Sequence, residues 1–450
     1  MGVATTYNPG WSAAPRGASY APGALESAPP FPMSRLNAIL LVVLAFVVPS
    51  AFSAGEAAST TAGARAAGAA RAGAQPATAA GSGLDIDPAT GLARTTVVRP
   101  LREFPAPPTG PATPGTTPER VPGASARGHL ALILPTASPV LGRLAEAVRQ
   151  GFVAATQVAG KDAPPVDVIP VADEGATMIE ACRNAQAAGA LLVIAAITRD
   201  GATALAKSDC AREPVLALNE PQGILPPDLP RNLFTVSLSI EQEARQVALM
   251  AVADGRRSAI VIGSSSPLAR RVREAFEREW SRAAGEIRHV DFSGNPEDGP
   301  LLRDQLESSK GDMVFLALEP VDARAVRPYV PAALPIYATS LSVNPRAESI
   351  VNLDLEGVRY VEMPWFVQPD HPAVMVYPQP SAPMSVDQER LYAFGIDAFR
   401  LALHMLRGDA RRTPLDGVTG RITLESGNAF LRTLTPADVE DGRVVPLRSP

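Results

Sequence analysis

Short apolar runs alternate with amphipathic helical patterns from residue 128 onward. A first series of runs occupies 130–134, 166–171, 191–195 and 215–218, and a second occupies 259–262, 288–292, 313–318, 336–339 and 358–363. Between the runs, apolar residues recur every three or four positions, which is typical of helices with one buried face. Strands separated by helices predict parallel sheets with right-handed crossovers. We therefore expect an α/β fold of two lobes, each a parallel sheet flanked by helices.

A strand, polar turn and helix start recur once along the chain. Ser138-Pro139 heads the first copy and Ser266-Pro267 heads the second, each after an apolar run. The serine is expected to cap the helix and the proline to occupy the first helical position. The repeat supports two similar lobes, with helix N-termini at the sheet edge where open α/β folds place their ligands.

The chain is expected to pass between the lobes near residues 234–239. A strong helical pattern at 388–406 should pack on the first lobe, and 420–424 and 430–434 read as two short strands around a turn at 426–428. We assign 128–450 to one two-lobed domain. Lobe 1 covers about 128–236 and part of 366–410, and lobe 2 covers about 237–365 plus the C-terminal strands.

The first 127 residues have a different character. Residues 1–53 read as a signal region, because Met33-Ser34-Arg35 precedes an apolar run at 36–48 and small residues up to Ser53. Met33 is a candidate initiator, and a retained membrane anchor is the alternative to cleavage. Residues 54–127 are rich in Ala, Gly, Thr and Pro and have few large apolar side chains, which predicts a disordered tether.

Charge and cysteine content narrow the classes of partner. The net charge is −5, from 41 basic and 46 acidic residues, so nucleic acid is not an expected partner. The two cysteines, Cys182 and Cys210, lie in neighbouring helical segments of the first lobe. In an exported protein they are candidates for one disulfide, and two free buried thiols are the alternative.

Polar residues at the strand ends are the candidate ligand-binding site. They are Thr136, Ser138, Thr198, Asn219, Ser264, Ser265 and Thr339. Hydroxyl and amide groups in a cleft between the lobes suit hydrogen bonding to a zwitterion or a sugar. The same residue types also cap helices and close turns, so a structural role is the alternative for each. No clear charged anchor for a ligand follows the first or third strand.

No arrangement of residues suggests catalysis. The histidines at 129, 289, 371 and 404 lack metal-ligand spacing, and neither a Gly-x-Ser-x-Gly elbow nor a phosphate-binding Gly-Lys-Ser/Thr loop occurs. We therefore expect a protein that is not an enzyme and has neither a metal nor a cofactor.

Three further features have both a functional and a structural interpretation. Trp365 and Phe366 precede a Pro-rich segment and form either a protein-binding loop or, as we favour, a packed staple. Asp397 is either a ligand-facing carboxylate or, more simply, an exposed or capped residue. The mixed arginines and glutamates of 270–282 are interpreted as a solvated helix face.

Two blocks of sequence carry a family resemblance. They are Glu362-Met363-Pro364-Trp365 and the run from Tyr392 to Leu401, supported by 129–135, 215–219, 243–246, 335–340, 355–361 and 417–422. Over roughly 128–447 the chain resembles the type I periplasmic binding protein fold. More narrowly, it resembles the C-terminal domain of the penicillin-binding protein activator (LpoA-like) family.

The resemblance implies a periplasmic regulator that binds and stimulates a class A penicillin-binding protein, a peptidoglycan synthase. Long members of that family carry a lipobox cysteine and a helical repeat domain. The signal region here contains no cysteine, so outer-membrane lipid anchoring is not expected. The alternative function is a solute-binding protein that delivers an amino acid or related small molecule to an ABC transporter or sensor.

Overall fold

The computed structural model describes residues 119–121, 128–283, 285–425 and 427–447. The described residues all belong to one compact unit of the chain. The expected signal region at 1–53, and the expected tether except for its residues 119–121, lie outside the described residues.

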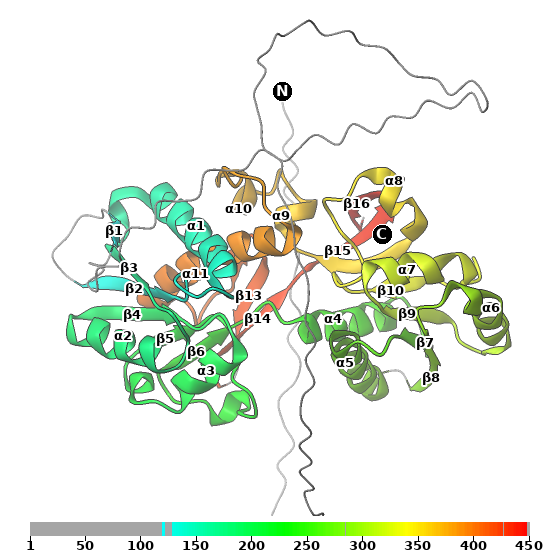
Figure 1. Cartoon of the computed structure of the whole chain (residues 1–450), viewed down its shortest axis with the longest axis horizontal. Coiled ribbons are helices and arrows are strands. Elements are labelled where there is room, and N and C mark those ends of the chain that lie inside the picture. Colours follow the sequence, from blue (N-terminus) through cyan, green and yellow to red (C-terminus); the bar gives the residue numbers. More distant parts are fainter. Residues whose placement is uncertain (1–118, 122–127, 284, 426, 448–450) are drawn as a thin grey trace, which may run out of the picture. The chain divides into compact units, whose positions relative to one another are not determined.

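The first lobe is built on a nine-stranded sheet (Figure 1). Its strands, in spatial order, are β1 (Glu119–Val121), β3 (Val166–Pro170), β2 (His129–Leu134), β4 (Ala190–Ala195), β5 (Val215–Ala217), β6 (Leu233–Val236), β14 (Ala429–Thr433), β13 (Gly420–Leu424) and β12 (Leu415–Gly417). Neighbours from β3 to β14 pair in parallel, whereas β1, β12 and β13 pair antiparallel at the edges. β2 is buried on both faces, as expected for a strand in the middle of a parallel sheet.

The second lobe is built on a seven-stranded sheet. In spatial order its strands are β16 (Arg443–Pro446), β15 (Thr435–Glu440), β11 (Val358–Glu362), β10 (Ile336–Ala338), β9 (Met313–Ala317), β7 (Ser258–Gly263) and β8 (Glu286–Asp291). The strands from β11 to β8 are parallel, and β15 and β16 add antiparallel pairs. Both sheets are therefore parallel in the middle and antiparallel at one or both edges.

Helices connect the parallel strands. Those of the first lobe are α1 (Gly142–Ala159), α2 (Ala176–Ala187), α3 (Arg199–Ala206) and α11 (Val386–Leu406). Those that follow the first passage between the lobes are α4 (Ile240–Ala253), α5 (Pro267–Ala283), α6 (Gly299–Ser308), α7 (Pro320–Val326), α8 (Ser349–Asn352), α9 (Pro364–Val367) and α10 (Pro372–Met375).

The chain passes between the lobes three times. The first passage runs from β6 to α4, the second from β11 through α9 and α10 to α11, and the third from β14 to β15. In Figure 1, the step from β14 to β15 crosses between the two lobes, and α4 lies beside α5 in the second lobe. Neither lobe is thus a continuous stretch of sequence, and each needs the returning chain to be complete.

The returning helix α11 packs on α1 at very short range. A Cβ atom at Gly151 would lie 1.8 Å from the carbonyl oxygen of Tyr392, and one at Gly395 would lie 2.1 Å from that of Val148. Only glycine permits this approach of two helix backbones. Phe152 and Phe399 meet edge to face beside it, with ring centroids 5.2 Å apart. The helix expected at 388–406 is thereby confirmed, and so is its place on the first lobe.

The α/β fold with two helix-flanked lobes is confirmed, with two corrections. Residues 119–121 do not belong to a tether, because they form β1 on the edge of the first sheet. The C-terminal strands do not all belong to lobe 2, because β14 pairs with β6 and only β15 and β16 join the second sheet. The hydrophobic pattern of a strand does not reveal its partner, which explains the second error. Among the described helices, none is long and apolar enough to cross a membrane.

Candidate functional site: the cleft between the lobes

A cleft of about 770 Å³ opens where the carboxyl ends of both parallel sheets meet. Arg199 and Asn219 line it from the first lobe, Arg271 and Ser340 line it from the second, and Glu241 lines it from the start of α4. This is the edge at which open α/β sheets place ligands. The cleft is consequently the candidate site, and its chemistry depends on how its charged groups are paired.

Glu241 holds two arginines from opposite lobes. Its Oε1 accepts from Arg199 at 2.7 Å and from Arg271 at 2.6 Å. Burial raises the pKa of Glu241, but the bonds from Arg271 and Arg199 outweigh it, and the resulting pKa is about 2. The carboxylate is therefore ionised at neutral pH and links α3 of the first lobe to α5 of the second.

A second group of charges lies deeper, where the passages meet. Arg390 on α11 donates to Glu362 at the end of β11, with an N–O distance of 2.9 Å. Glu243 on α4 is buried, and its Oε2 accepts from the backbone N–H of Ser340 at 3.1 Å. Arg390 and Glu243 also line the cleft. The floor of the cleft is thus charged, and every one of these side chains has a protein partner.

The pKa of Glu243 is raised well above its ordinary value. Burial raises its pKa, the nearby Glu362 carboxylate raises it further, and the bond from Ser340 together with Arg390 and Arg432 only partly offsets this, which leaves a pKa of about 7. An ionised carboxylate in such a place is costly because water no longer solvates it. Glu243 therefore gains a proton close to neutral pH.

Arg432 and Asp397 complete the polar contacts at the passages. Arg432 on β14 is 4% exposed and donates to the carbonyl oxygens of Ser237 and Thr419 at 2.8 and 2.9 Å. Asp397 on α11 accepts from the N–H groups of Val418 and Thr419 at 3.0 and 2.7 Å. Asp397 is therefore a buried structural carboxylate. It is not exposed, which corrects that part of the favoured interpretation, and it is not among the residues that line the cleft.

Of the residues proposed as ligand contacts, Asn219 is among those that line the cleft. Its amide donates to the carbonyl oxygen of Ile197 at 2.8 Å, so it also braces the loop after β4. Thr198 caps α3 by accepting from Gly201 and donates to Glu174. Glu174 in turn accepts from the N–H groups of Ile197 and Thr198 at 2.6 and 2.9 Å. Thr198 is thus held within the first lobe.

The other proposed contacts lie in turns near the cleft rather than among its lining residues. Thr136 is half-buried and Ser265 is exposed. Ser138 accepts from Leu141 at 3.3 Å, Ser264 from Ser266 at 3.5 Å, and the buried Thr339 from Leu341 at 3.3 Å. For Ser138, Ser264 and Thr339 the structure shows turn hydrogen bonds, while a role in binding a ligand stays a prediction.

The repeated Ser-Pro turn is not the same in both lobes. Pro267 is the first residue of α5, as expected. Pro139 is not the first residue of α1, because a turn closed by Ser138 delays the helix until Gly142, whose N–H donates to the Ser138 carbonyl at 2.9 Å. Ser266 donates its hydroxyl to Glu319 at 3.0 Å. The expected proline position is therefore confirmed in the second copy and wrong in the first.

Trp365 packs inside the protein, as the favoured interpretation predicted. It is 2% exposed, and its indole N–H donates to Glu389 at 2.9 Å. The half-buried Phe366 lies under two guanidinium groups, those of Arg346 at 4.9 Å and Arg390 at 5.7 Å from the ring centroid. The aromatic pair therefore packs the second passage against α11.

The two cysteines are buried, and their side chains contact each other. A hydrogen bond between them, together with burial, raises the pKa of Cys182, and the same bond lowers the pKa of Cys210. The contact joins α2 to the turn after α3, since Gln186 also donates to the carbonyl oxygen of Cys210 at 2.9 Å. The disulfide stays a prediction.

Sequence reasoning missed the charged groups of the cleft. Arg199 lies four residues after the third strand, where no charged anchor was identified, and Arg271 belongs to the helix face interpreted as solvated. The sequence showed Glu241 as an acidic residue at the start of a helix, with nothing to indicate its arginine partners. The position of Arg199 after a strand end was a usable signal, but its pairing with Glu241 depends on the second lobe.

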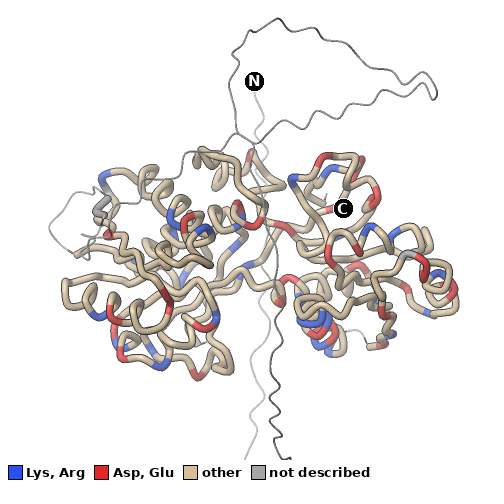
Figure 2. The backbone as a smooth tube through the Cα atoms, in the orientation of Figure 1, with Lys and Arg blue, Asp and Glu red and all other residues tan. Residues whose placement is uncertain are grey.

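Outside the cleft, the charges of the described residues are of both signs. Figure 2 shows basic and acidic positions interspersed over both lobes. Among the described residues, no group of three or more His, Cys, Asp or Glu is placed to hold a metal ion.

Two helix-flanked sheets, three passages and a cleft at the carboxyl ends of the strands define a two-lobed protein of the periplasmic-binding-protein-like class. The family model described as "LppC putative lipoprotein" matches residues 125–442. The chain belongs to this family.

Two curated relatives share the name penicillin-binding protein activator LpoA. The penicillin-binding protein activator LpoA of Enterobacter sp. (strain 638) is 25% identical over 304 residues, which cover 57% of this chain and 41% of the relative. LpoA of Escherichia coli (strain K12) is 25% identical over 306 residues, covering 58% and 44%. The chain thus spans less than half the length of these two relatives.

Solved structures agree on the fold. A "putative branched-chain amino acid ABC transporter" from Chromobacterium violaceum has a TM-score of 0.60 and 36% identity, covering 69% of this chain and all of that one. The LpoA C-domain from Haemophilus influenzae, described as a regulator of PBP1A, has a TM-score of 0.59 and 22% identity, covering 71% and 100%.

A disulfide between Cys182 and Cys210 can be tested by alkylation. If the bond forms in the exported protein, alkylation of the denatured, unreduced chain should label neither Cys182 nor Cys210, and the tryptic peptides should stay linked until reductant is added. Mass spectrometry measures this. Labelling of both thiols without reductant would show that they stay free.

We predict that the buried Glu243 makes the unfolding free energy of the protein depend on pH. Its folded pKa of about 7 lies above the ordinary 4.5, so the folded state binds more protons between these values and stability falls as pH rises through them. Glu243→Gln removes this ionisation but keeps an acceptor for Ser340. As the pH rises from 4.5 to 8, the unfolding free energy of the variant should therefore increase relative to that of the wild type by on the order of 3 kcal/mol.

Urea unfolding at several pH values measures this difference. Glu213→Gln, a change at an exposed glutamate, is the control and should leave the pH dependence as it is. A Glu243→Gln variant whose unfolding curves run parallel to the wild type at all pH values would contradict the buried-carboxylate account.

Proposed function

We propose that this chain is a periplasmic, non-enzymatic regulator that binds and stimulates a class A penicillin-binding protein. The observation that carries the proposal is the family match over residues 125–442, which includes nearly all of both lobes, together with curated relatives named as activators. The partner's class, the periplasmic location and the absence of catalysis are parts of the proposal.

The pairing of charges in the cleft supports a regulator. Glu241 is already bonded to Arg199 and Arg271, and Arg390 is bonded to Glu362. A charged ligand would have to take the place of these partners, and breaking the existing ion pairs would cost their interaction free energy. A surface that recognises another protein needs no such exchange.

The mechanism of stimulation is a population shift. A regulator that binds the active state of the synthase more tightly than its inactive state raises the active fraction by that difference in affinity. Residues 54–118 would serve as the tether that lets the two-lobed domain reach its partner, and residues 1–53 as the export signal.

A direct test pairs binding with turnover. The tagged chain from residue 54 should co-purify a class A synthase from the same cells and raise its glycan polymerisation rate several-fold in vitro. A second form that begins at Glu119 keeps β1 and removes the proposed tether. It should still stimulate the purified synthase in solution, because the described unit carries its own cores.

Recovery of no synthase, together with unchanged turnover in vitro, would contradict the proposal. Loss of stimulation in the form that begins at Glu119 would place the activity in the segment before it.

A second candidate function is binding of an amino acid or related solute for a transporter or sensor. The observation in its favour is the cleft of about 770 Å³, with Asn219 and Ser340 on its walls, combined with the 36% identity to the Chromobacterium violaceum protein. The cleft ligand contacts proposed from the sequence belong to this function.

Thermal-shift measurements separate the two functions. Leucine, isoleucine, valine and peptidoglycan fragments should leave the Tm unchanged if the chain is a regulator. A ligand at a hundred times its Kd would stabilise the protein by about 2.7 kcal/mol and raise the Tm. A rise that Asn219→Ala abolishes, with Asn232→Ala as the control outside the cleft, would establish solute binding.

A further inference from the structure

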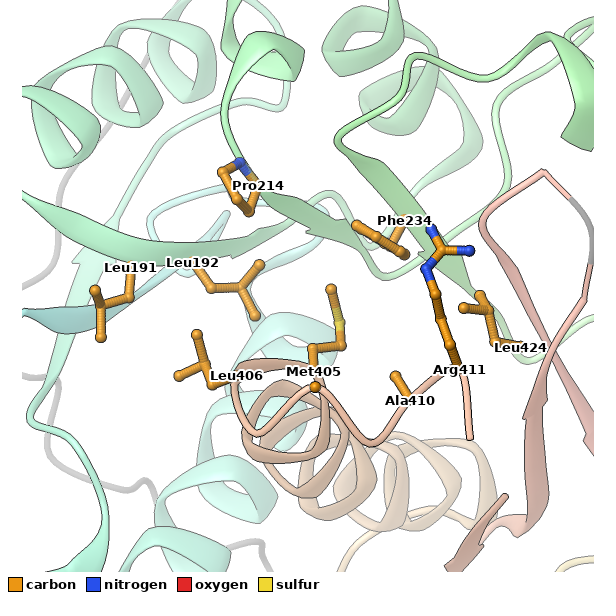
Figure 3. A pocket seen from close by; sticks show the side chains of 10 residues that line it. Leu191, Leu192, Pro214, Phe234, Met405, Leu406, Ala410, Arg411 and Leu424 are labelled. Carbon is orange, nitrogen blue, oxygen red and sulfur yellow. The ribbon is translucent and has the colours of Figure 1, made fainter. Parts of the chain in front are cut away.

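A second cavity lies at the edge of the first sheet that is opposite the cleft. It has a volume of about 310 Å³ and is formed by the amino ends of β4, β5 and β6, the end of α11 and the end of β13. Figure 3 shows Leu191 and Leu192 on one side, Met405 and Leu406 below, and Phe234 beside the Arg411 guanidinium. The cavity is separate from the cleft and shares none of its lining residues.

The lining is apolar, and part of it remains uncovered. Leu191 is 43% exposed and Leu406 is 39% exposed, whereas Leu192 behind them is buried. Adjacent exposed leucines at the mouth of an apolar pocket are typical of protein contact sites, where an anchoring side chain fills the pocket and the partner covers the rim. A ligand small enough for the cavity alone would leave the rim leucines in water.

The lining carries one positive charge, Arg411, and Arg407 and Arg412 lie close to it in the sequence. Arg407, Arg411 and Arg412 follow one another closely after α11 and are exposed, with Asp409 as the one acid between them. Arg411 donates to the amide oxygen of Asn428 at 3.0 Å, which fixes its position without neutralising it. A carboxylate beside the anchoring side chain would complement this charge.

We propose that this cavity is the docking site for an apolar side chain flanked by acidic residues on the penicillin-binding protein partner. The inference rests on the proposed function and adds the surface through which the partner is held. The apolar side chain occupies the space between Leu192 and Met405, and a neighbouring carboxylate pairs with Arg411. The cleft takes no part in this contact.

The test measures the Kd of the full chain for the purified synthase. Leu191→Glu and Leu406→Glu place a negative charge at the mouth of the pocket and should each raise the Kd at least tenfold. Both residues are partly exposed, so folding should persist, and circular dichroism checks this. Leu301→Glu, at an exposed leucine on α6 of the second lobe, is the matched control and should bind like the wild type.

Arg411→Glu tests the charge without touching the apolar wall. It should raise the Kd several-fold and reduce the salt dependence of binding, whereas Arg270→Glu, at an exposed arginine on α5, should change neither. These two variants keep the proposal testable even if a leucine variant unfolds.

The outcomes are distinguishable. If the Leu191→Glu, Leu406→Glu and Arg411→Glu variants all bind the synthase as tightly as the wild type does, this inference is overturned and the proposed function stands. A wild-type chain that binds no synthase overturns both. Micromolar binding of free octanoate that Arg411→Glu abolishes, with synthase binding unaffected by the variants, would overturn the docking site in favour of a small-molecule site.

Discussion

The bond between Gln246 and Leu434 shows how the whole structure depends on ties between separate passages. The Gln246 side chain on α4 donates to the carbonyl oxygen of Leu434 at 2.7 Å and accepts from its N–H at 3.0 Å. Leu434 is the residue between β14 and β15, so this pair joins the first passage to the third. Arg432 makes a parallel tie from β14 to Ser237. Two lobes that are each discontinuous in sequence need such contacts, because the chain crosses between the sheets in three separate passages.

The buried charges at the passages give these ties their specificity. An arginine or carboxylate in the interior is costly unless its hydrogen bonds are satisfied, so a misplaced passage would leave Arg432 or Glu362 without partners. The same logic extends into the cleft, where Glu241 bonds to arginines of both lobes. The interior polar groups therefore favour one arrangement of the lobes. The surfaces left for a partner are the outer ones, and the apolar cavity beside Arg411 is among them.

Sequence patterns predicted the elements well and their partners poorly. The apolar runs located most of the strands and the helix at Val386–Leu406, although β6, β12, β15 and β16 were not among the expected strands. The blocks around Trp365 and Tyr392 carried the family resemblance, because these residues occupy the second passage. The pairing of β14 with β6 was not predictable, since strands of either lobe share the same hydrophobic pattern. Hydroxyl groups at strand ends were chosen as ligand contacts, yet those of Ser138, Ser264 and Thr339 accept hydrogen bonds within their turns. The charged lining went unseen because Arg199, Glu241 and Arg271 converge only when both lobes are assembled.

The lobes keep one arrangement, which leaves the ion pairs of the cleft intact. The distance between spin labels at Glu213→Cys on the first lobe and Glu307→Cys on the second measures this arrangement, since both positions are exposed. Pulsed electron resonance should give a single narrow distribution that leucine, peptidoglycan fragments and the synthase leave unchanged. A second, shorter distance whose population increases as an amino acid is added would contradict a single arrangement of the lobes and would identify a cleft that closes on its ligand.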